Sequence, residues 1–225
     1  MNLNSPSISP KDSSASEERS LTGFYGSYKI TNTDKKEVRN YRISLLACSL
    51  SLFFGLIHLS IFNNNLAWIW LVSIAINLGF ALNWIHIYVR ALHNTLKLFW
   101  ILGCLGLVIM TANLGINNIL SSIINQPIWT ILIGPLFAAL TGLGFKEFFC
   151  FRRPEAFGLT IILPITLIGY IANLMNSSIV MSLLFLCAVL FVILSIRKFG
   201  IDAAADIGDK SIFEHLKKQR ENSLA

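Results

Sequence analysis

Residues 179–198 read IVMSLLFLCAVLFVILSIRK, in which eighteen uncharged residues are followed directly by an arginine and a lysine. A helix that rises 1.5 Å per residue needs about 20 such residues to cross the ~30 Å hydrocarbon core of a bilayer. The whole chain has the same bias, because 54% of its 225 residues are hydrophobic and only 13% are charged. That is roughly half the charge usual in soluble domains. The stretch therefore predicts a transmembrane helix of an integral membrane protein.

Five further apolar runs precede this one, and each is long enough to cross a bilayer. Lipid offers no hydrogen-bond partners, so the backbone groups of each run must be paired within it, and each run is predicted to be a helix. The six predicted spans cover approximately residues 43–62, 66–86, 97–116, 128–150, 156–174 and 179–196. The fold class that follows is all-α: a polytopic membrane helical bundle with six transmembrane helices, forming one domain over residues 24–200.

The placement of lysine and arginine indicates how the bundle is oriented. Basic residues occur before the first predicted span and around the linkers that follow the second, fourth and sixth, whereas the other three linkers contain no charged residue. The residues that mark this side are Lys35, Lys36, Arg39, Arg42, Arg90, Lys97, Lys146, Arg152, Arg153, Arg197 and Lys198. Because cytoplasmic loops carry the excess of lysine and arginine, both termini are predicted to lie in the cytoplasm.

The two ends of the chain differ from the apolar domain in composition. Residues 1–23 are rich in serine and are predicted to form a disordered tail, because they contain too few large apolar side chains to offset the entropy of ordering. Residues 201–225 form a polar C-terminal tail, in which Ser211 and Glu214 have the spacing of a capping box. Two interpretations of this tail stay open: a short helix on the membrane surface, or a frayed and solvated end.

Charge and cysteine content limit the partners of the chain. The formal net charge is +6, but the basic residues lie in short clusters between apolar runs. This pattern favours anionic headgroups on the cytoplasmic side of the bilayer over nucleic acid. Cys48, Cys104, Cys150 and Cys187 are scattered singly, without a CxxC pair. Neither a disulfide framework nor a zinc site is indicated, and no cofactor can be assigned.

Small residues recur in the predicted fourth span. Gly134, Ala138 and Gly142 are spaced by four and are predicted to share one helix face. Such a face lets a neighbouring helix approach closely. Helix packing is therefore the interpretation of these three residues, and the neighbour is a helix of the same chain, of a second copy or of another membrane protein.

A cluster of polar residues is predicted at the cytoplasmic ends of the second and fourth spans. Its members are His86, Arg90, His93, Lys146, Glu147, Cys150, Arg152 and Arg153. Glu147 stands among four phenylalanines, and we interpret it as an anchor paired with Lys146 or Arg90. The alternative is a carboxylate that accepts a proton or binds a cation. The histidines lack HxxxH or HExxH spacing, so no metal site is predicted.

Two stretches of the chain resemble a known family. The first contains Thr31, Asp34, Glu37, Val38, Tyr41 and Arg42, and the second reads GLGFKEFFCFRRPEAF over residues 142–157. Together they resemble an uncharacterised family of integral membrane proteins found mainly in cyanobacteria, and the resemblance covers roughly residues 24–200. It implies a membrane protein without an established activity and brings no catalytic residues. The plasma membrane and an internal membrane such as the thylakoid are both compatible with it.

Three functions are compatible with these features. The favoured one is a non-enzymatic bundle that interacts with or assembles other membrane components. The second is a small transporter or channel for a neutral or weakly charged solute, lined by Asn77, Thr166 and His58. The third is a membrane enzyme that uses Glu147 with His86. No Asp, Glu, Lys or Arg lies near the middle of a predicted span, which counts against an ion-coupled carrier.

The predicted orientation can be tested by cysteine labelling after the native cysteines have been replaced by serine. Single cysteines at Asn64, Asn118 or Ser177 lie in the uncharged linkers, so a membrane-impermeant maleimide should label them in intact cells. A cysteine at Arg90 is the control, and it should react only after the membrane is permeabilised. Protection of any of the three outer positions in intact cells would overturn the six-span topology.

Overall fold

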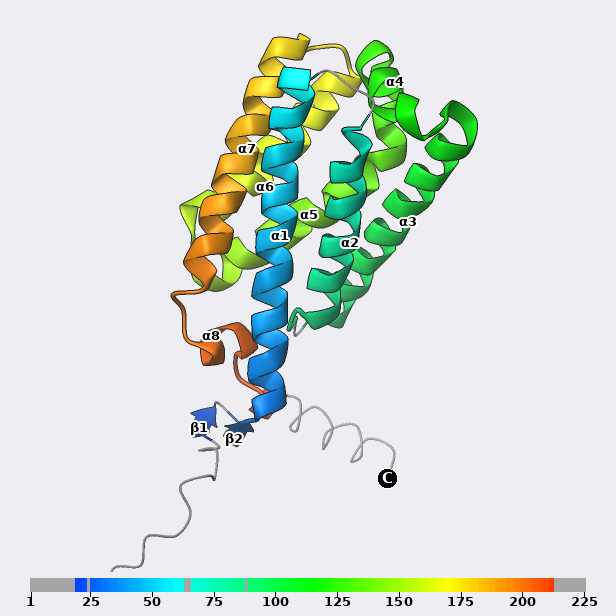
Figure 1. Ribbon diagram of the computed structural model, residues 1–225. Helices are drawn as coiled ribbons and strands as arrows, with labels where there is room; N and C mark the ends of the chain where they lie inside the picture. The colour runs from blue at the N-terminus through cyan, green and yellow to red at the C-terminus, as the bar shows by residue number, and fades with distance from the viewer. Residues whose placement is uncertain (1–18, 24, 63–65, 88, 213–225) are drawn as a thin grey trace, which may run out of the picture.

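The computed structural model describes residues 19–23, 25–62, 66–87 and 89–212 (Figure 1). A two-stranded hairpin comes first and is followed by long helices with shorter helical segments between and after them. The strands are β1 (Arg19–Gly23) and β2 (Gly26–Ile30). The long helices are α1 (Asn32–Phe62), α2 (Trp68–Trp84), α3 (Arg90–Leu114), α5 (Thr130–Phe151), α6 (Pro154–Ile171) and α7 (Ser177–Lys198). The short segments are η1 (Ile116–Asn118), α4 (Ile119–Asn125), η2 (Pro127–Trp129) and α8 (Ala203–Ile207).

Five helices in the described part of the chain are long and apolar enough to cross a membrane: α1, α3, α5 with η2, α6 and α7. The sixth, α2, is apolar and has 17 residues, about 26 Å of helix at 1.5 Å per residue, which is close to the lower limit for a span. It ends where Ile85 takes an extended conformation with a ψ of 132°. The predicted all-α polytopic membrane bundle is therefore confirmed, with a small hairpin added to it.

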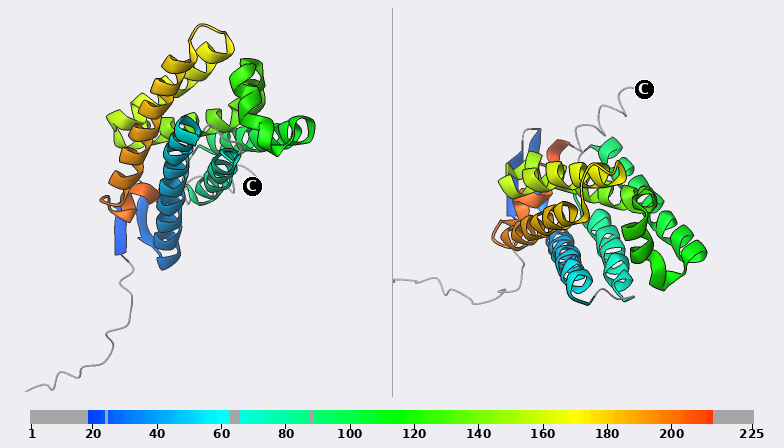
Figure 2. Two further views of the ribbon diagram at one scale, coloured as in Figure 1. Left: turned by 45° about the horizontal axis from the view of Figure 1, so that its top comes forward. Right: turned by 90° about the horizontal axis from the view of Figure 1, so that it is seen from above.

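The six long helices form a closed ring. Helix α1 packs against α2, α2 against α3, α3 against α5, α5 against α6, α6 against α7, and α7 again against α1. The right-hand view of Figure 2 shows the six helices from above, that is, from the top of Figure 1. Each of the six helices contributes side chains without exposed surface to the core, among them Leu45, Leu78, Met110, Leu140, Leu163 and Phe191. The hairpin and α8 lie at one end of the ring (Figure 1), which we call the hairpin end.

Helix ends follow from local sequence. Thr31 and Asp34 form a capping box at the start of α1: the Asp34 amide donates to Thr31 Oγ1 at 3.3 Å, and the Thr31 amide donates to Asp34 Oδ2 at 2.8 Å. Helix α5 ends because Arg152 adopts a left-handed conformation with a φ of 49°. Pro154 then begins α6, where its missing N–H costs nothing. The turn is short, so α5 and α6 pack side by side.

The structure corrects the predictions for both chain ends. Residues 19–23, predicted to belong to a disordered tail, form β1, which pairs antiparallel with β2; residues 1–18 lie outside the described part of the chain. Residues 201–212, predicted to be a polar tail, contain α8, which packs against α1. Ile207 of α8 is buried with Ile30 and Val38, so a small apolar cluster holds this segment down. The surface helix predicted from Ser211 onward falls mostly on residues 213–225, which the structure does not describe.

A close approach between α3 and α5 depends on glycines of α3. A Cβ atom added to Gly103 would lie 2.5 Å from the backbone nitrogen of Leu136, and one added to Gly106 would overlap the carbonyl oxygen of Leu132. Both obstacles are backbone atoms of α5, which cannot rotate away as a side-chain tip can. The two helices can therefore pack this closely only because both positions lack a side chain.

The small-residue face predicted for α5 is only partly a contact face. Gly142 does lie against α3, because an added Cβ would overlap the side chain of Leu96. Gly134 has no atom within 4 Å of such a Cβ, so it makes no close helix contact, and Ala138 is partly exposed. A spacing of four turns a helix by about 400°, so each step rotates the stripe by about 40°. Over eight residues this rotation is enough to turn Gly134 away from the neighbour of Gly142.

Gly106→Ala tests the contact between α3 and α5. The new methyl group must push back the backbone of Leu132, so the free energy of unfolding in detergent should fall by about 1–3 kcal/mol, the usual cost of overpacking. Gly158→Ala in α6 is the control, because its Cβ would meet only the tip of the Leu190 side chain, at 2.7 Å. Equal thermal stability of the two variants would contradict the backbone contact.

Candidate functional site

A carboxylate without exposed surface is the centre of the candidate site. Glu147 lies near the end of α5 and is 0% exposed. Its Oε1 accepts hydrogen bonds from the Tyr41 hydroxyl at 2.6 Å and from Lys146 Nζ at 3.0 Å. Its Oε2 accepts from Lys198 Nζ at 2.7 Å. Donors from α1, α5 and α7 therefore meet on one carboxylate, and both of its oxygens are occupied.

The chain of charges continues from Lys198 to α8 and back to α1. Lys198 Nζ also donates to Asp206 Oδ1. Asp206 Oδ2 accepts from Arg42 at 2.8 Å from Nε and at 2.5 Å from Nη2, a two-pronged contact that suits the planar guanidinium. Arg42 Nη2 also donates to the Asp202 carbonyl oxygen at 3.3 Å. We call Tyr41, Arg42, Lys146, Glu147, Lys198 and Asp206 the ionic network.

Positive and negative charges alternate along the network. Each of its charged side chains is at most 9% exposed. Three cations and two carboxylates leave one net positive charge. Two aromatic rings lie close to the two lysine ammonium groups. Lys198 Nζ is 4.0 Å and Lys146 Nζ is 5.6 Å from the centre of the Phe151 ring. The same two atoms are 5.5 Å and 5.4 Å from the centre of the Tyr41 ring. Cation–π attraction at desolvated sites is worth about 2 kcal/mol. The rings thus help to replace the water that burial removes.

This arrangement suits a structural role. Removing an ion from water costs several kcal/mol even after relaxation, and only good geometry with further hydrogen bonds offsets the cost. The network meets that condition, because each carboxylate contacts at least two donors. Its four elements, α1, α5, α7 and α8, are far apart in sequence and are held together at the hairpin end (Figure 1). A fully enclosed carboxylate with both oxygens engaged offers no free position to a substrate or an incoming cation.

The other predicted cluster residues have partners other than Glu147 or are exposed. His86 pairs with Glu37 at 3.2 Å, and His93 Nε2 lies 2.9 Å from the Leu82 carbonyl oxygen. Arg90, Cys150 and Arg152 are exposed. Arg153 is 3.9 Å from Glu155, which Arg197 contacts more closely at 2.9 Å. Of the two partners predicted for Glu147, Lys146 contacts it, whereas Arg90 is exposed.

Three residues near the start of α1 offer metal-ligand atoms. The ligand atoms of Asp34, Glu37 and His86 lie within 4.8 Å of one another. Asp34 is already engaged, because Lys210 Nζ lies 2.5 Å from its Oδ2. His86 lies in the connection after α2, where burial lowers the pKa of its imidazole and Glu37 acts in the opposite direction. The existing ion pairs account for this cluster without a metal ion.

Four members of the network were not predicted as site residues. Tyr41 and Arg42 belong to the stretch on which the family resemblance depends, and Arg42 and Lys198 were used to predict the orientation. Asp206 lies in the segment predicted to be a polar tail. The signal that could have found them is their type and place: charged residues at the ends of apolar helices on one side of a membrane need partners there. Which of them pair is decided only by helix packing.

Comparison with known proteins supports the membrane assignment. A family model described as an uncharacterized integral membrane protein (DUF2301) matches residues 80–215. The matched range includes Lys146, Glu147, Lys198 and Asp206, whereas Tyr41 and Arg42 precede it. No curated protein matches the chain, and no solved structure matches it.

A double-mutant cycle tests the pairing of Glu147 with Lys198. Glu147→Gln leaves two buried ammonium groups beside a neutral amide, and the free energy of unfolding in detergent should fall by about 3–5 kcal/mol. Adding Lys198→Met removes one stranded charge, so the double variant should lose less than the sum of the two single variants. Glu155→Gln is the control. Its carboxylate is 5% exposed, but its closest partner, Arg197, is 53% exposed. Neutralising Glu155 therefore strands no buried cation and should cost less than Glu147→Gln. Strict additivity would contradict a coupled network.

Proposed function

We propose that this chain, which belongs to the family of uncharacterized integral membrane proteins (DUF2301), is a non-enzymatic bundle. It binds and assembles other membrane components. The observation that carries the proposal is the ionic network. Its charges satisfy one another inside the protein, and the spans present mainly apolar side chains to their surroundings. Such a bundle has the means to pack against lipid and other helices.

An enzyme that uses Glu147 with His86 receives no support from the geometry. Glu147 is enclosed by Tyr41, Lys146 and Lys198, while His86 pairs with Glu37 near the start of α1. A general acid or base must come within about 3 Å of the proton that it transfers. A substrate would have to displace the network to reach Glu147, which makes this the weakest of the three functions.

The transport alternative is also weakened. Thr166 Oγ1 donates to the Ile162 carbonyl oxygen at 2.7 Å, and Asn77 Nδ2 donates to that of Ser73 at 2.8 Å. Both bonds stay within the residue's own helix. His58 Nδ1 accepts from Trp70 Nε1 at 2.8 Å. A polar pathway through a membrane needs such groups turned toward a common space, and these three are turned to other partners.

The hairpin end supplies a surface for the proposed interactions. Five of the exposed cations at or near it, Lys35, Lys36, Arg39, Arg90 and Arg152, form what we call the basic rim. Each such cation near an anionic membrane surface contributes about 1 kcal/mol of attraction. We assign anionic headgroups of the cytoplasmic leaflet to the basic rim. The network supports this role by fixing α8 against α1 and α7.

Complementation of a strain that lacks the gene tests the proposal. The double variant Glu147→Gln with Lys198→Met should restore the cellular phenotype when its abundance is raised to that of the wild type, because it retains the outer surfaces. Neutralising Lys35, Lys36 and Arg39 to Gln should reduce the anionic phospholipid that stays bound in native mass spectrometry. A folded and abundant network variant that fails to complement would overturn the proposal and place chemistry at Glu147.

A further inference from the structure

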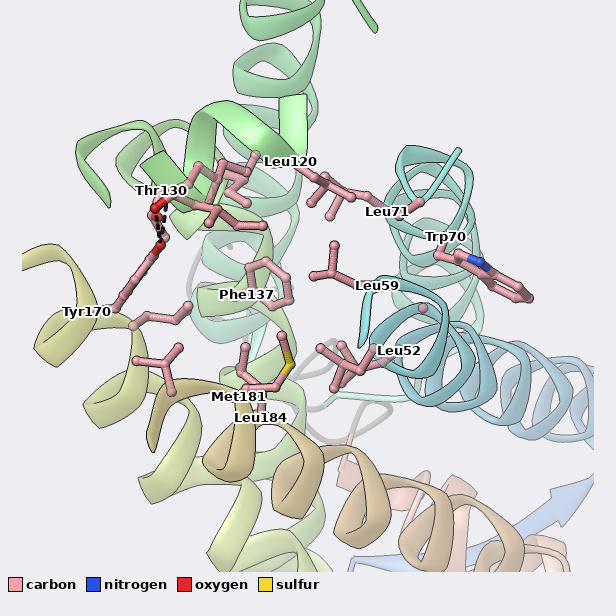
Figure 3. A pocket seen from close by; sticks show the side chains of 18 of the residues that line it. Leu52, Leu59, Trp70, Leu71, Leu120, Thr130, Phe137, Tyr170, Met181 and Leu184 are labelled. Atoms are coloured by element: carbon pink, nitrogen blue, oxygen red, sulfur yellow. Dashed lines mark hydrogen bonds between the residues drawn. The ribbon is translucent and has the colours of Figure 1, made fainter. Parts of the chain in front are cut away.

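The ring of helices contains a half-open cavity toward the end opposite the hairpin (Figure 3). Its volume is about 240 Å³, and its walls come from α1, α2, α4, α5, α6 and α7. Nearly all of the lining side chains are apolar; Leu52, Leu59, Phe137, Met181 and Leu184 lie around the empty centre (Figure 3). An engineered apolar cavity of about 150 Å³ already binds benzene. This space is therefore large enough for a segment of hydrocarbon chain.

One buried side-chain polar group in the cavity wall has no partner among the described residues. Thr130 is 2% exposed, and its Oγ1 makes no hydrogen bond. Leaving a buried hydroxyl unpaired costs about 1–3 kcal/mol. The Tyr170 hydroxyl, which also lines the cavity, is satisfied, because it donates to the carbonyl oxygens of Ile123 at 2.9 Å and Ile124 at 3.3 Å. Thr130 thus places an unpaired donor in the wall of a largely apolar space, and a rotation of its side chain would turn that donor toward a ligand.

The position of Thr130 indicates which ligand fits. Thr130 is the first residue of α5 and directly follows Trp129, an aromatic residue of the kind that marks the level of the headgroups. The ester carbonyls of glycerolipids lie at this boundary, with their acyl chains pointing toward the membrane centre. From Thr130 the cavity wall continues along α5 to Phe137, about 10 Å deeper at 1.5 Å per residue.

We propose that the cavity binds one acyl chain of a membrane glycerolipid, and that the ester carbonyl of this chain accepts a hydrogen bond from Thr130 Oγ1. The chain fills the apolar space between α1, α5 and α7. This site goes beyond the proposed assembly function and does not depend on it, since it lies away from the ionic network and the basic rim.

Photolabelling of the full chain in nanodiscs tests the site. The probe is a phosphatidylcholine with a diazirine in its sn-2 acyl chain, present at trace level in unlabelled phosphatidylcholine. Irradiation should label residues 52–59 and 180–184, in addition to the lipid-facing side of α3, which serves as the internal reference. Thr130→Val should reduce cavity labelling relative to α3 by about three- to tenfold, the range expected for one neutral hydrogen bond. Thr141→Val is the matched control: its Oγ1 is also buried and unpaired, but Thr141 does not line the cavity, so labelling should stay unchanged.

A second pair of variants tests occupancy of the space. Leu59→Trp fills the cavity and should abolish labelling of residues 180–184. Ile61→Trp places the same side chain on the same helix at a position that is 68% exposed, and it should leave labelling intact. Circular dichroism and thermal unfolding identify any variant that fails to fold.

Two labelling results would overturn the proposal. Wild-type labelling of the cavity in folded Leu59→Trp would show that the lipid does not enter this space. Loss in Leu59→Trp without any change in Thr130→Val would show that bulk hydrocarbon fills the cavity without the ester bond. In lipid-free detergent, Thr130→Val should be at least as stable as the wild type, because it removes an unpaired hydroxyl. A lower unfolding temperature would mean that Thr130 is bonded within the protein, which also contradicts the proposal.

Discussion

A carboxylate that is buried at the end of a membrane helix must be surrounded by hydrogen-bond donors, and Glu147 imposes this requirement on the bundle. Neither lipid nor an apolar core can stabilise its charge. The donors come from α1, α5 and α7, so these three helices must bring the right faces together at the same depth. Lys198 in turn requires a second carboxylate, which α8 supplies with Asp206. The segment after the last span is therefore part of the fold.

The two ends of the ring are chemically opposite. At the hairpin end, charges and aromatic rings fill the interior, and the structure has no need of water there. Toward the other end, the helices leave a largely apolar cavity whose wall holds a buried, unpaired hydroxyl, that of Thr130. A pathway for a polar solute would need polar groups at both levels. The combination of a filled ionic end and an apolar recess favours a protein that binds membrane components over one that conducts solutes across the bilayer.

Parts of the candidate site could be predicted, and the reason differs from residue to residue. Glu147 could be identified because a carboxylate among phenylalanines at a span end is rare and needs a cation nearby. Lys146 is its neighbour in sequence. Arg90 was equally plausible as a partner, because it shares the same side of the membrane, yet it is exposed. Lys198, the actual second cation, is the last residue of α7, and it reaches Glu147 because α7 packs against α1, the helix that carries Tyr41.

The sequence by itself determined the spans, the helical fold and the gathering of basic residues on one side. These follow from local composition, since an apolar run in lipid has no alternative to a helix. Tertiary structure alone decided that Lys198 rather than Arg90 meets Glu147, that Gly103 and Gly106 rather than Gly134 carry the close contact between α3 and α5, and that a cavity remains beside Thr130. Each of these depends on how the helices pack against neighbours that are distant in the chain, which local composition does not specify.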